Sequence, residues 1–118
     1  TGVTAAVKSR NLQGKVFVSG LDGETQALRS IAECAQTMTV YTDVRDYSTA
    51  AVQAAVALAK GETPASDRVT ATPAGDVPTH LVKIMAVNKD NLCDTIQNVM
   101  VPGWTTVEAV FGSADACN

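Results

Sequence analysis

Asp22 is the side chain with the clearest chemical potential, and it lies in the segment Gly20-Leu21-Asp22-Gly23 directly after a short apolar run. The run predicts a strand and the residues that follow predict a helix, so the carboxylate is expected at the carboxyl end of a strand. An ionised carboxylate can accept hydrogen bonds from two neighbouring hydroxyl groups in a planar, charge-assisted arrangement. The same aspartate could instead only stabilise the first turn of the helix. Composition favours neither interpretation.

Thr42 is the second candidate, because the segment Tyr41-Thr42-Asp43 ends the next predicted strand. Ligands of open α/β sheets bind beyond the carboxyl ends of the strands, and Asp22 and Thr42 both occupy such ends. We therefore treat both as candidate ligand-binding residues, while an ordinary strand-to-loop turn would also explain the second segment. Trp104 could stack on a ligand ring, but packing is the commoner role of a single tryptophan.

Motifs for catalysis and for nucleotide binding are missing from the sequence, which contains no G-x-x-x-x-G-K-[ST], G-x-G-x-x-G or G-x-S-x-G. The single histidine, His80, has no cluster of metal ligands near it, and we interpret it as a surface or edge residue. We expect no catalytic residues, no metal site and no cofactor.

Three cysteines, Cys34, Cys93 and Cys117, form no C-x-x-C pair. A Cys93–Cys117 disulfide would form in an oxidising compartment and would leave Cys34 as a buried thiol, whereas three free thiols are the alternative. The sequence does not decide between them.

The composition excludes several classes of protein. Of the 118 residues 46% are hydrophobic and 18% charged, so a packed core is expected. The formal net charge is −3, and lysine and arginine gather in no stretch, which argues against a nucleic-acid partner. No apolar run approaches the roughly 18 residues of a membrane span.

The start of the sequence suggests a fragment. No signal peptide follows Thr1, and Val3–Arg10 has the pattern of a helix whose beginning is missing.

Hydrophobic spacing predicts that helices and strands alternate, which favours a parallel sheet covered by right-handed crossovers. Strands are predicted over residues 15–20, 37–41 and 80–87. The first should be a buried parallel strand, and the second alternates with period two. The predicted helices are 3–10, one that follows Gly23, one from an N-cap at Asp46 to Lys60, 89–96, and a short one over 107–111. Residues 62–78 are typical of a long loop. The helix after Gly23 should bury Ala27, Leu28, Ile31, Ala32 and Ala35 and expose Arg29, Ser30 and Glu33.

Four segments carry a resemblance to a known family: Gly14–Gly23, Gln36–Tyr41, Ala50–Glu62 and Val87–Leu92. In this order and spacing they resemble the periplasmic sugar-binding proteins of ABC transporters, of the ribose, xylose and multiple-sugar type. Gln-Thr-Met-Thr-Val-Tyr, from position 36 to 41, is the most specific piece. The resemblance covers nearly the whole chain and weakens near its end.

The resemblance implies a type I periplasmic-binding-protein fold, in which two α/β lobes are joined by three crossing segments. The chain would be the C-terminal portion of such a protein and hold parts of both lobes. Residues 1–41 would belong to the C-terminal lobe, 42–80 to the N-terminal lobe after a hinge crossing, and 81–118 to the C-terminal lobe and tail. The helix up to Lys60 would then expose an apolar face, which predicts association with the missing N-terminal portion or a second copy.

The same resemblance implies a receptor function and no enzymatic activity. A monosaccharide, a xylose-like pentose or a related sugar, would bind between the lobes, and the closed form would dock on a membrane permease. The protein would be periplasmic or otherwise extracytoplasmic, secreted or lipid-anchored. Asp22 would contact sugar hydroxyls, and Thr42 would lie at the second crossing, where relatives often carry a longer polar or basic side chain. Cys34 stands where relatives commonly carry glycine.

Other hypotheses remain open at this point. The effector domain of a sugar-responsive transcription repressor shares the fold and would need a DNA-binding headpiece before Thr1. A sugar-metabolising α/β enzyme would need a catalytic constellation, and none is visible. A fragment of a receptor could also self-associate without binding sugar.

Overall fold

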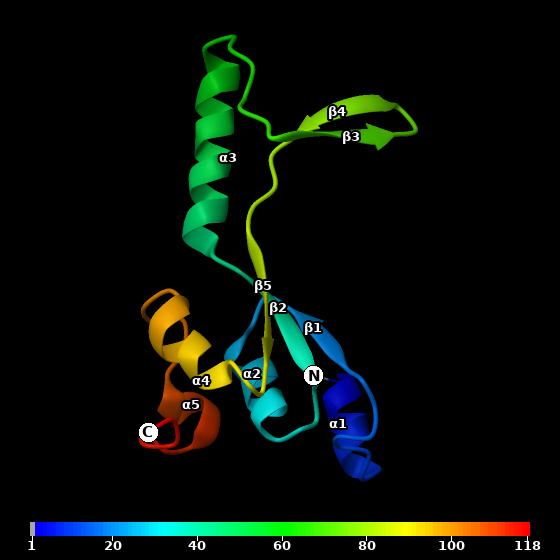
Figure 1. Ribbon diagram of the computed structural model, residues 1–118, viewed down its shortest axis with the longest axis vertical. Helices are drawn as coiled ribbons and strands as arrows, with labels where there is room; N and C mark the ends of the chain where they lie inside the picture. Colours follow the sequence, from blue (N-terminus) through cyan, green and yellow to red (C-terminus); the bar gives the residue numbers. More distant parts are fainter. Residues whose placement is uncertain (1) are drawn as a thin grey trace. The chain divides into compact units, whose positions relative to one another are not determined.

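The computed structural model describes residues 2–118, which divide into two units (Figure 1). Unit 1 holds the described residues up to Thr42 together with Ile84–Asn118, and unit 2 holds Asp43–Lys83. The chain therefore passes between the units twice, after Thr42 and after Lys83. The breaks expected from the sequence, after residues 41 and 80, lie close to these points. The assignment of the units to lobes remains a prediction.

Unit 1 contains a three-stranded sheet with strand order β1-β2-β5. The strands are β1 (Ser19–Leu21), β2 (Met38–Thr42) and β5 (Ile84–Asn88). The parallel pairing of β1 with β2, joined by a helix, confirms the α/β class with a partial parallel sheet. The expectation that the third strand is also parallel was wrong, because β5 pairs antiparallel to β2. Thr42, the last residue of β2, lies opposite Ile84, the first residue of β5, so the chain leaves and re-enters unit 1 at the same end of the sheet.

The core of unit 1 combines one face of the sheet with the helices that follow β1 and β5. The helices of this unit are α1 (Gly2–Ser9), α2 (Thr25–Ala32), α4 (Leu92–Asp94), the π-helical η1 (Thr95–Val99) and α5 (Val107–Phe111). The last of these has the bounds expected from the sequence. The buried cluster consists of Leu28, Ile31, Tyr41, Val87, Leu92, Ile96, Met100 and Val110.

Ser30 of α2 is buried, although the sequence predicted that it faces solvent. Its hydroxyl donates to the carbonyl oxygen of Gln26, so burial leaves no polar atom unpaired. Its own carbonyl accepts from the N–H groups of Ala35 and Gln36, which folds the segment after the helix back over it. The inward face of α2 is therefore wider than apolar spacing alone indicates.

The strand expected over residues 15–20 is shorter and more exposed than the apolar run predicted. Only β1 forms, at an edge of the sheet, and Phe17 before it is 74% exposed. Turns occupy the preceding segment, where Gly14 N–H donates to the Cys34 carbonyl and Lys15 N–H to that of Leu12. Burial of this strand would require a further strand beside β1, and the described residues supply none.

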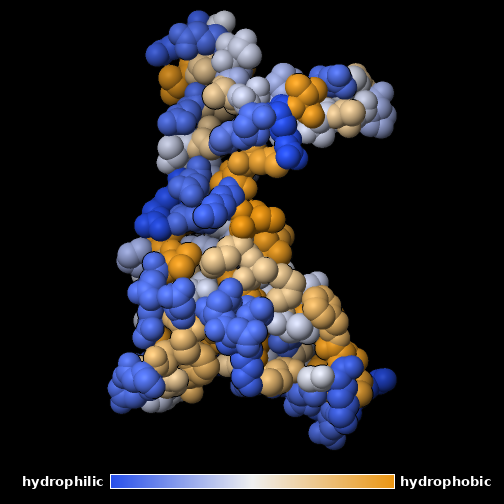
Figure 2. Space-filling model, viewed as in Figure 1, coloured by the Kyte–Doolittle hydropathy of each residue, from blue (hydrophilic) through white to orange (hydrophobic). Residues whose placement is uncertain are grey.

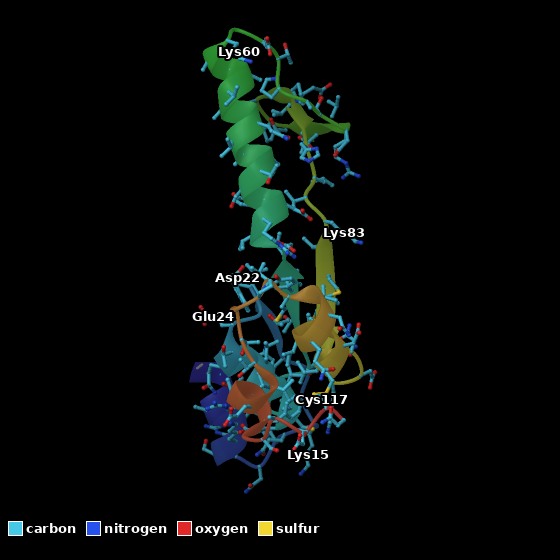
Figure 3. The ribbon with its side chains drawn as sticks, turned by 90° about the vertical axis from the view of Figure 1, so that its left-hand side faces the viewer. Lys15, Asp22, Glu24, Lys60, Lys83 and Cys117 are labelled. Carbon is cyan, nitrogen blue, oxygen red and sulfur yellow. A yellow bond between two sulfur atoms is a disulfide. The ribbon has the colours of Figure 1, made fainter. Side chains whose placement is uncertain are left out.

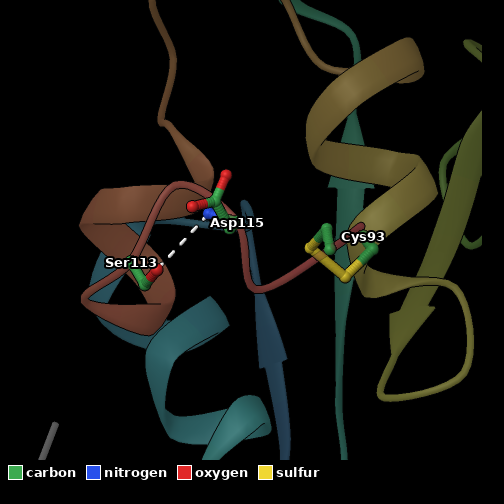
Figure 4. The surroundings of a disulfide bond; sticks show 4 residues. Cys93, Ser113 and Asp115 are labelled. Atoms are coloured by element: carbon green, nitrogen blue, oxygen red, sulfur yellow. Dashed lines mark hydrogen bonds between the residues drawn. A yellow bond between two sulfur atoms is a disulfide. The ribbon is translucent and has the colours of Figure 1, made fainter.

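A disulfide joins Cys93 to Cys117, with Cα atoms 5.5 Å apart (Figure 4). It ties the C-terminal segment that follows α5 to the helical segment that follows β5. Cys34 is a free thiol, but it is exposed and not buried as expected. It follows α2 in a left-handed conformation with φ of 59°, which is the reason a glycine would suit the position.

Unit 2 consists of helix α3 (Val44–Ala59) and the antiparallel hairpin of β3 (Arg68–Thr72) and β4 (Gly75–Thr79). The N-cap of α3 is Asp43 and not Asp46, because the Asp43 carboxylate accepts from the N–H of Arg45 at 2.8 Å and Asp46 lies inside the first turn. The Arg45 guanidinium also donates to this carboxylate and holds the pKa of Asp43 below its usual value.

The hairpin replaces part of the long loop expected over residues 62–78, so that prediction was wrong. Prolines and a glycine led to it, but Pro73 lies in the two-residue turn, and Gly75 after the turn has φ of 121°. Pro78 lies in β4, which in a two-stranded hairpin is an edge strand where a missing N–H is tolerated. Proline and glycine therefore occur at the turn and in the edge strand of a hairpin, and they did not indicate a loop without strands.

No residue of α3 is buried, and this includes the apolar stripe formed by Tyr47, Ala51, Ala54, Ala55 and Leu58. Tyr47 is 61% and Leu58 65% exposed, and apolar side chains lie on the surface of both units (Figure 2). An open cavity of about 400 Å³ is lined on one side by the alanines of this helix and on the other by Ala65, His80 and Val82. The described residues thus leave the stripe without the packing partner that such a helix requires.

Candidate ligand-binding site

Asp22 and Thr42 lie at the same end of the parallel strand pair in unit 1. Leu21 of β1 is in register with Val40 of β2, and the N–H of Asp22 extends this ladder by donating to the Val40 carbonyl at 2.7 Å. Thr42 is the last residue of β2. Figure 3 shows Asp22 at the end of the sheet where β2 leaves the unit. The structure therefore places both candidates at the carboxyl ends of neighbouring strands, as the sequence predicted.

The Asp22 carboxylate has no hydrogen-bond or ion-pair partner among residues 2–118, and its side chain is exposed. Its backbone is left-handed, with φ of 75°, which is uncommon for a residue other than glycine. The helix-capping interpretation does not hold, because α2 begins after Glu24 and Asp22 bonds to none of its N–H groups. The carboxylate is therefore open to solvent and available to a ligand, and a non-glycine residue held in this backbone region is a candidate functional position.

Thr42 contributes a second polar side chain without a partner among the described residues at this end of the sheet. Burial alternates along β2, so that Thr39 and Tyr41 point into the core while Thr42 is half-buried. Its hydroxyl makes no hydrogen bond within the described part of the chain. A short hydroxyl side chain here can donate to or accept from a small ligand, but only from a ligand that approaches the strand end closely.

The turn behind Asp22 is held by residues that the sequence did not reveal as part of the site. Gly23 has φ of 64°, and its N–H donates to the Thr39 hydroxyl at 3.3 Å. Its carbonyl accepts from the indole Nε1 of Trp104 at 2.9 Å. Trp104 also packs edge-on against the Tyr41 ring, with centroids 6.0 Å apart, so within unit 1 it supports the core and the turn. Trp104 lies 81 residues from Gly23 in sequence, so no local sequence pattern could indicate this contact.

Alanine at position 23 should destabilise unit 1 by about 2 kcal/mol, because a left-handed backbone disfavours any Cβ. A methyl group there would also lie 3.2 Å from both Met100 Cε and Tyr41 Cδ2. Urea unfolding followed by Trp104 fluorescence measures the effect. Gly14→Ala is the matched control, because Gly14 has φ of 70° but no atom within 4 Å of the added methyl. If Gly23→Ala cost no more than Gly14→Ala, the close packing behind the turn would be contradicted.

His80 lies in unit 2, half exposed, with Nδ1 3.0 Å from the Asp67 carboxylate, which confirms a surface histidine. Within residues 2–118, no three His, Cys, Asp or Glu side chains are grouped so that they could hold a metal ion. In the same residues, no helix combines the length and apolar character needed to cross a membrane.

Two curated proteins are similar in sequence to this chain. The chain is 36% identical over 95 residues to the D-xylose-binding periplasmic protein of Escherichia coli K12, and 32% identical over 110 residues to the protein of that name from Haemophilus influenzae Rd. The chain is homologous to part of the periplasmic sugar-binding proteins. These matches span 80% and 93% of this chain, but only 29% and 32% of the relatives, so the chain covers about a third of their length. No family model matches the sequence.

Solved structures agree with this relationship. A carbohydrate transporter solute-binding protein from Chloroflexus aurantiacus, in complex with D-glucose, superposes with a TM-score of 0.71 at 26% identity. That match covers 91% of this chain and 32% of the other. An ABC transporter solute-binding protein from Clostridium phytofermentans with bound β-D-glucose gives a TM-score of 0.70 at 19% identity, over 92% of this chain and 33% of that one, and supports the fold alone. The fold of this chain is thus that of part of the sugar-binding periplasmic proteins.

Proposed function

We propose that the chain is part of the solute receptor of an ABC-type sugar importer and that it contributes Asp22 and Thr42 to a monosaccharide site. The observation that carries the proposal is the exposed Asp22 carboxylate, which has no partner among the described residues and is fixed in a left-handed turn at a strand's carboxyl end. Such a group can accept hydrogen bonds from two adjacent sugar hydroxyls. The relatives named for D-xylose and the neighbour solved with D-glucose support a sugar as the ligand.

The proposed receptor has two lobes, of which unit 1 would belong to the C-terminal lobe and unit 2 to the N-terminal lobe. Asp43 caps α3 immediately after Thr42, so the end of β2 and the start of the helix flank the first of the two passages between units. A bound sugar that contacts both lobes would favour their closed arrangement, and a closed receptor would dock on the permease. The uncovered stripe of α3 would pack against the rest of the N-terminal lobe.

The relatives are periplasmic binding proteins, so we assign this chain to an extracytoplasmic, secreted or lipid-anchored receptor that binds its sugar without chemical change. The Cys93–Cys117 disulfide is compatible with an oxidising compartment.

Thermal unfolding of the whole receptor with xylose, ribose, glucose, galactose and arabinose tests the proposal. Because a ligand stabilises the state that binds it, one pentose or hexose at a hundred times its Kd should add about 2.7 kcal/mol of stability. A receptor whose Tm did not move with any of the five sugars would overturn the assignment to sugar transport.

A further inference from the structure

The turn that presents Asp22 contains two successive left-handed residues, with φ of 75° at Asp22 and 64° at Gly23. Glycine adopts this conformation without a steric cost, whereas an L-residue such as Asp22 costs about 1–2 kcal/mol relative to the right-handed region. The surrounding structure must therefore hold Asp22 in the turn. Two of its tethers come from the neighbouring strand, through Val40 and Thr39. Both hydrogen bonds are donated by N–H groups of the turn, so the carbonyl of Gly23 must be paired with a different residue.

That partner is Trp104, whose Nε1–H donates to the Gly23 carbonyl at 2.9 Å in a partly buried position. The tryptophan is itself fixed by its T-shaped contact with Tyr41 and by its backbone N–H, which donates to the Val101 carbonyl at 2.9 Å. Val101 N–H in turn donates to the Tyr41 hydroxyl. A short, cross-bonded segment of the C-terminal part of the chain therefore holds the Asp22 turn from behind.

We infer that Trp104 is a positioning residue for the sugar site, acting through Gly23 on the direction of the Asp22 carboxylate. Its indole N–H is bonded to the backbone of the turn, and its ring packs against Tyr41. This inference rests on the proposed function, but the tether itself can be tested without sugar. A small rotation of the turn would displace both carboxylate oxygens, and charge-assisted bonds depend strongly on geometry.

Amide hydrogen exchange in this chain tests the tether directly. Trp104→Phe keeps an aromatic ring against Tyr41 and removes the indole N–H. We expect the amides of Asp22 and Gly23 to exchange on the order of tenfold faster. The amide of Leu28 in α2, which donates to the carbonyl of the N-cap residue Glu24, should keep its exchange rate after correction for global stability. Tyr41→Phe is the matched control, because it removes one bond from the same segment but leaves the Gly23 carbonyl paired. Equal acceleration at all three amides would overturn the inference.

Sugar affinity in the whole receptor then tests the positioning role. Trp104→Phe should weaken binding on the order of tenfold, and should weaken it by less than about twofold when Asp22 is already asparagine, because the two residues act as one unit. A Trp104→Phe receptor that binds like the wild type, or that loses affinity equally in both backgrounds, would contradict the inference. If the wild type binds no sugar, the proposed function fails and the exchange experiment alone judges the tether.

Discussion

Replacing Asp22 with alanine in the whole receptor should weaken sugar binding about a hundredfold or more. Its carboxylate accepts no hydrogen bond from the described protein, so a ligand's hydroxyl groups can use both oxygens. Hydrogen bonds to a charged group contribute roughly 1.5–3 kcal/mol each, and two of them correspond to at least this loss of affinity. Calorimetric titration with the sugar that stabilises the wild type most measures the change.

Glu24→Gln provides the control for this experiment. Glu24 is an exposed carboxylate two residues away whose side chain makes no capping bond, so its replacement should change affinity by less than about twofold. Asp22→Asn keeps the size of the side chain and one acceptor oxygen, and should lie between wild type and alanine. Wild-type affinity in Asp22→Ala, or an equal loss in Glu24→Gln, would show that no specific contact is made by Asp22.

Removing the Cys93–Cys117 disulfide should lower the free energy of unfolding of this chain by about 3 kcal/mol. The two cysteines are 24 residues apart in sequence, and without the bond the unfolded chain recovers the freedom of that loop. The segment after α5 would also lose its covalent anchor to α4. Urea unfolding of Cys93→Ser/Cys117→Ser against the oxidised wild type gives the difference.

Cys34→Ser separates this effect from other thiol chemistry. Cys34 is free and exposed, so its replacement should leave the urea midpoint unchanged, and reductant should lower the midpoint of Cys34→Ser as much as that of the wild type. Reductant should have no effect on the double serine variant. A wild type equally stable in its reduced and oxidised forms would contradict a structural role for the disulfide.

Local sequence patterns predicted the parts of the fold whose causes are local. The period-two alternation of β2 places Thr39 and Tyr41 inward, and α5 begins after the side-chain cap of Thr106 and ends at the left-handed Gly112. Asp22 was identified by its place after a strand and beside glycine, and the structure adds that its carboxylate is unpaired within residues 2–118.

Features set by distant partners were not predictable in this way. The direction of β5 follows from where the chain re-enters unit 1, and no property of residues 84–88 themselves reports it. The exposure of Phe17 and of the α3 stripe depends on packing partners that the described residues do not supply. The hydrogen bond from Trp104 to the Asp22 turn likewise forms only when the C-terminal segment packs against the rest of unit 1.

A crystal structure of the whole receptor with the sugar that stabilises it most tests the central claim most directly. We predict the sugar at the carboxyl ends of β1 and β2, with the two Asp22 oxygens about 2.5–2.8 Å from adjacent hydroxyl groups of the ring. Thr42 should line the same site. A sugar bound elsewhere, with the Asp22 carboxylate left in solvent, would contradict the account.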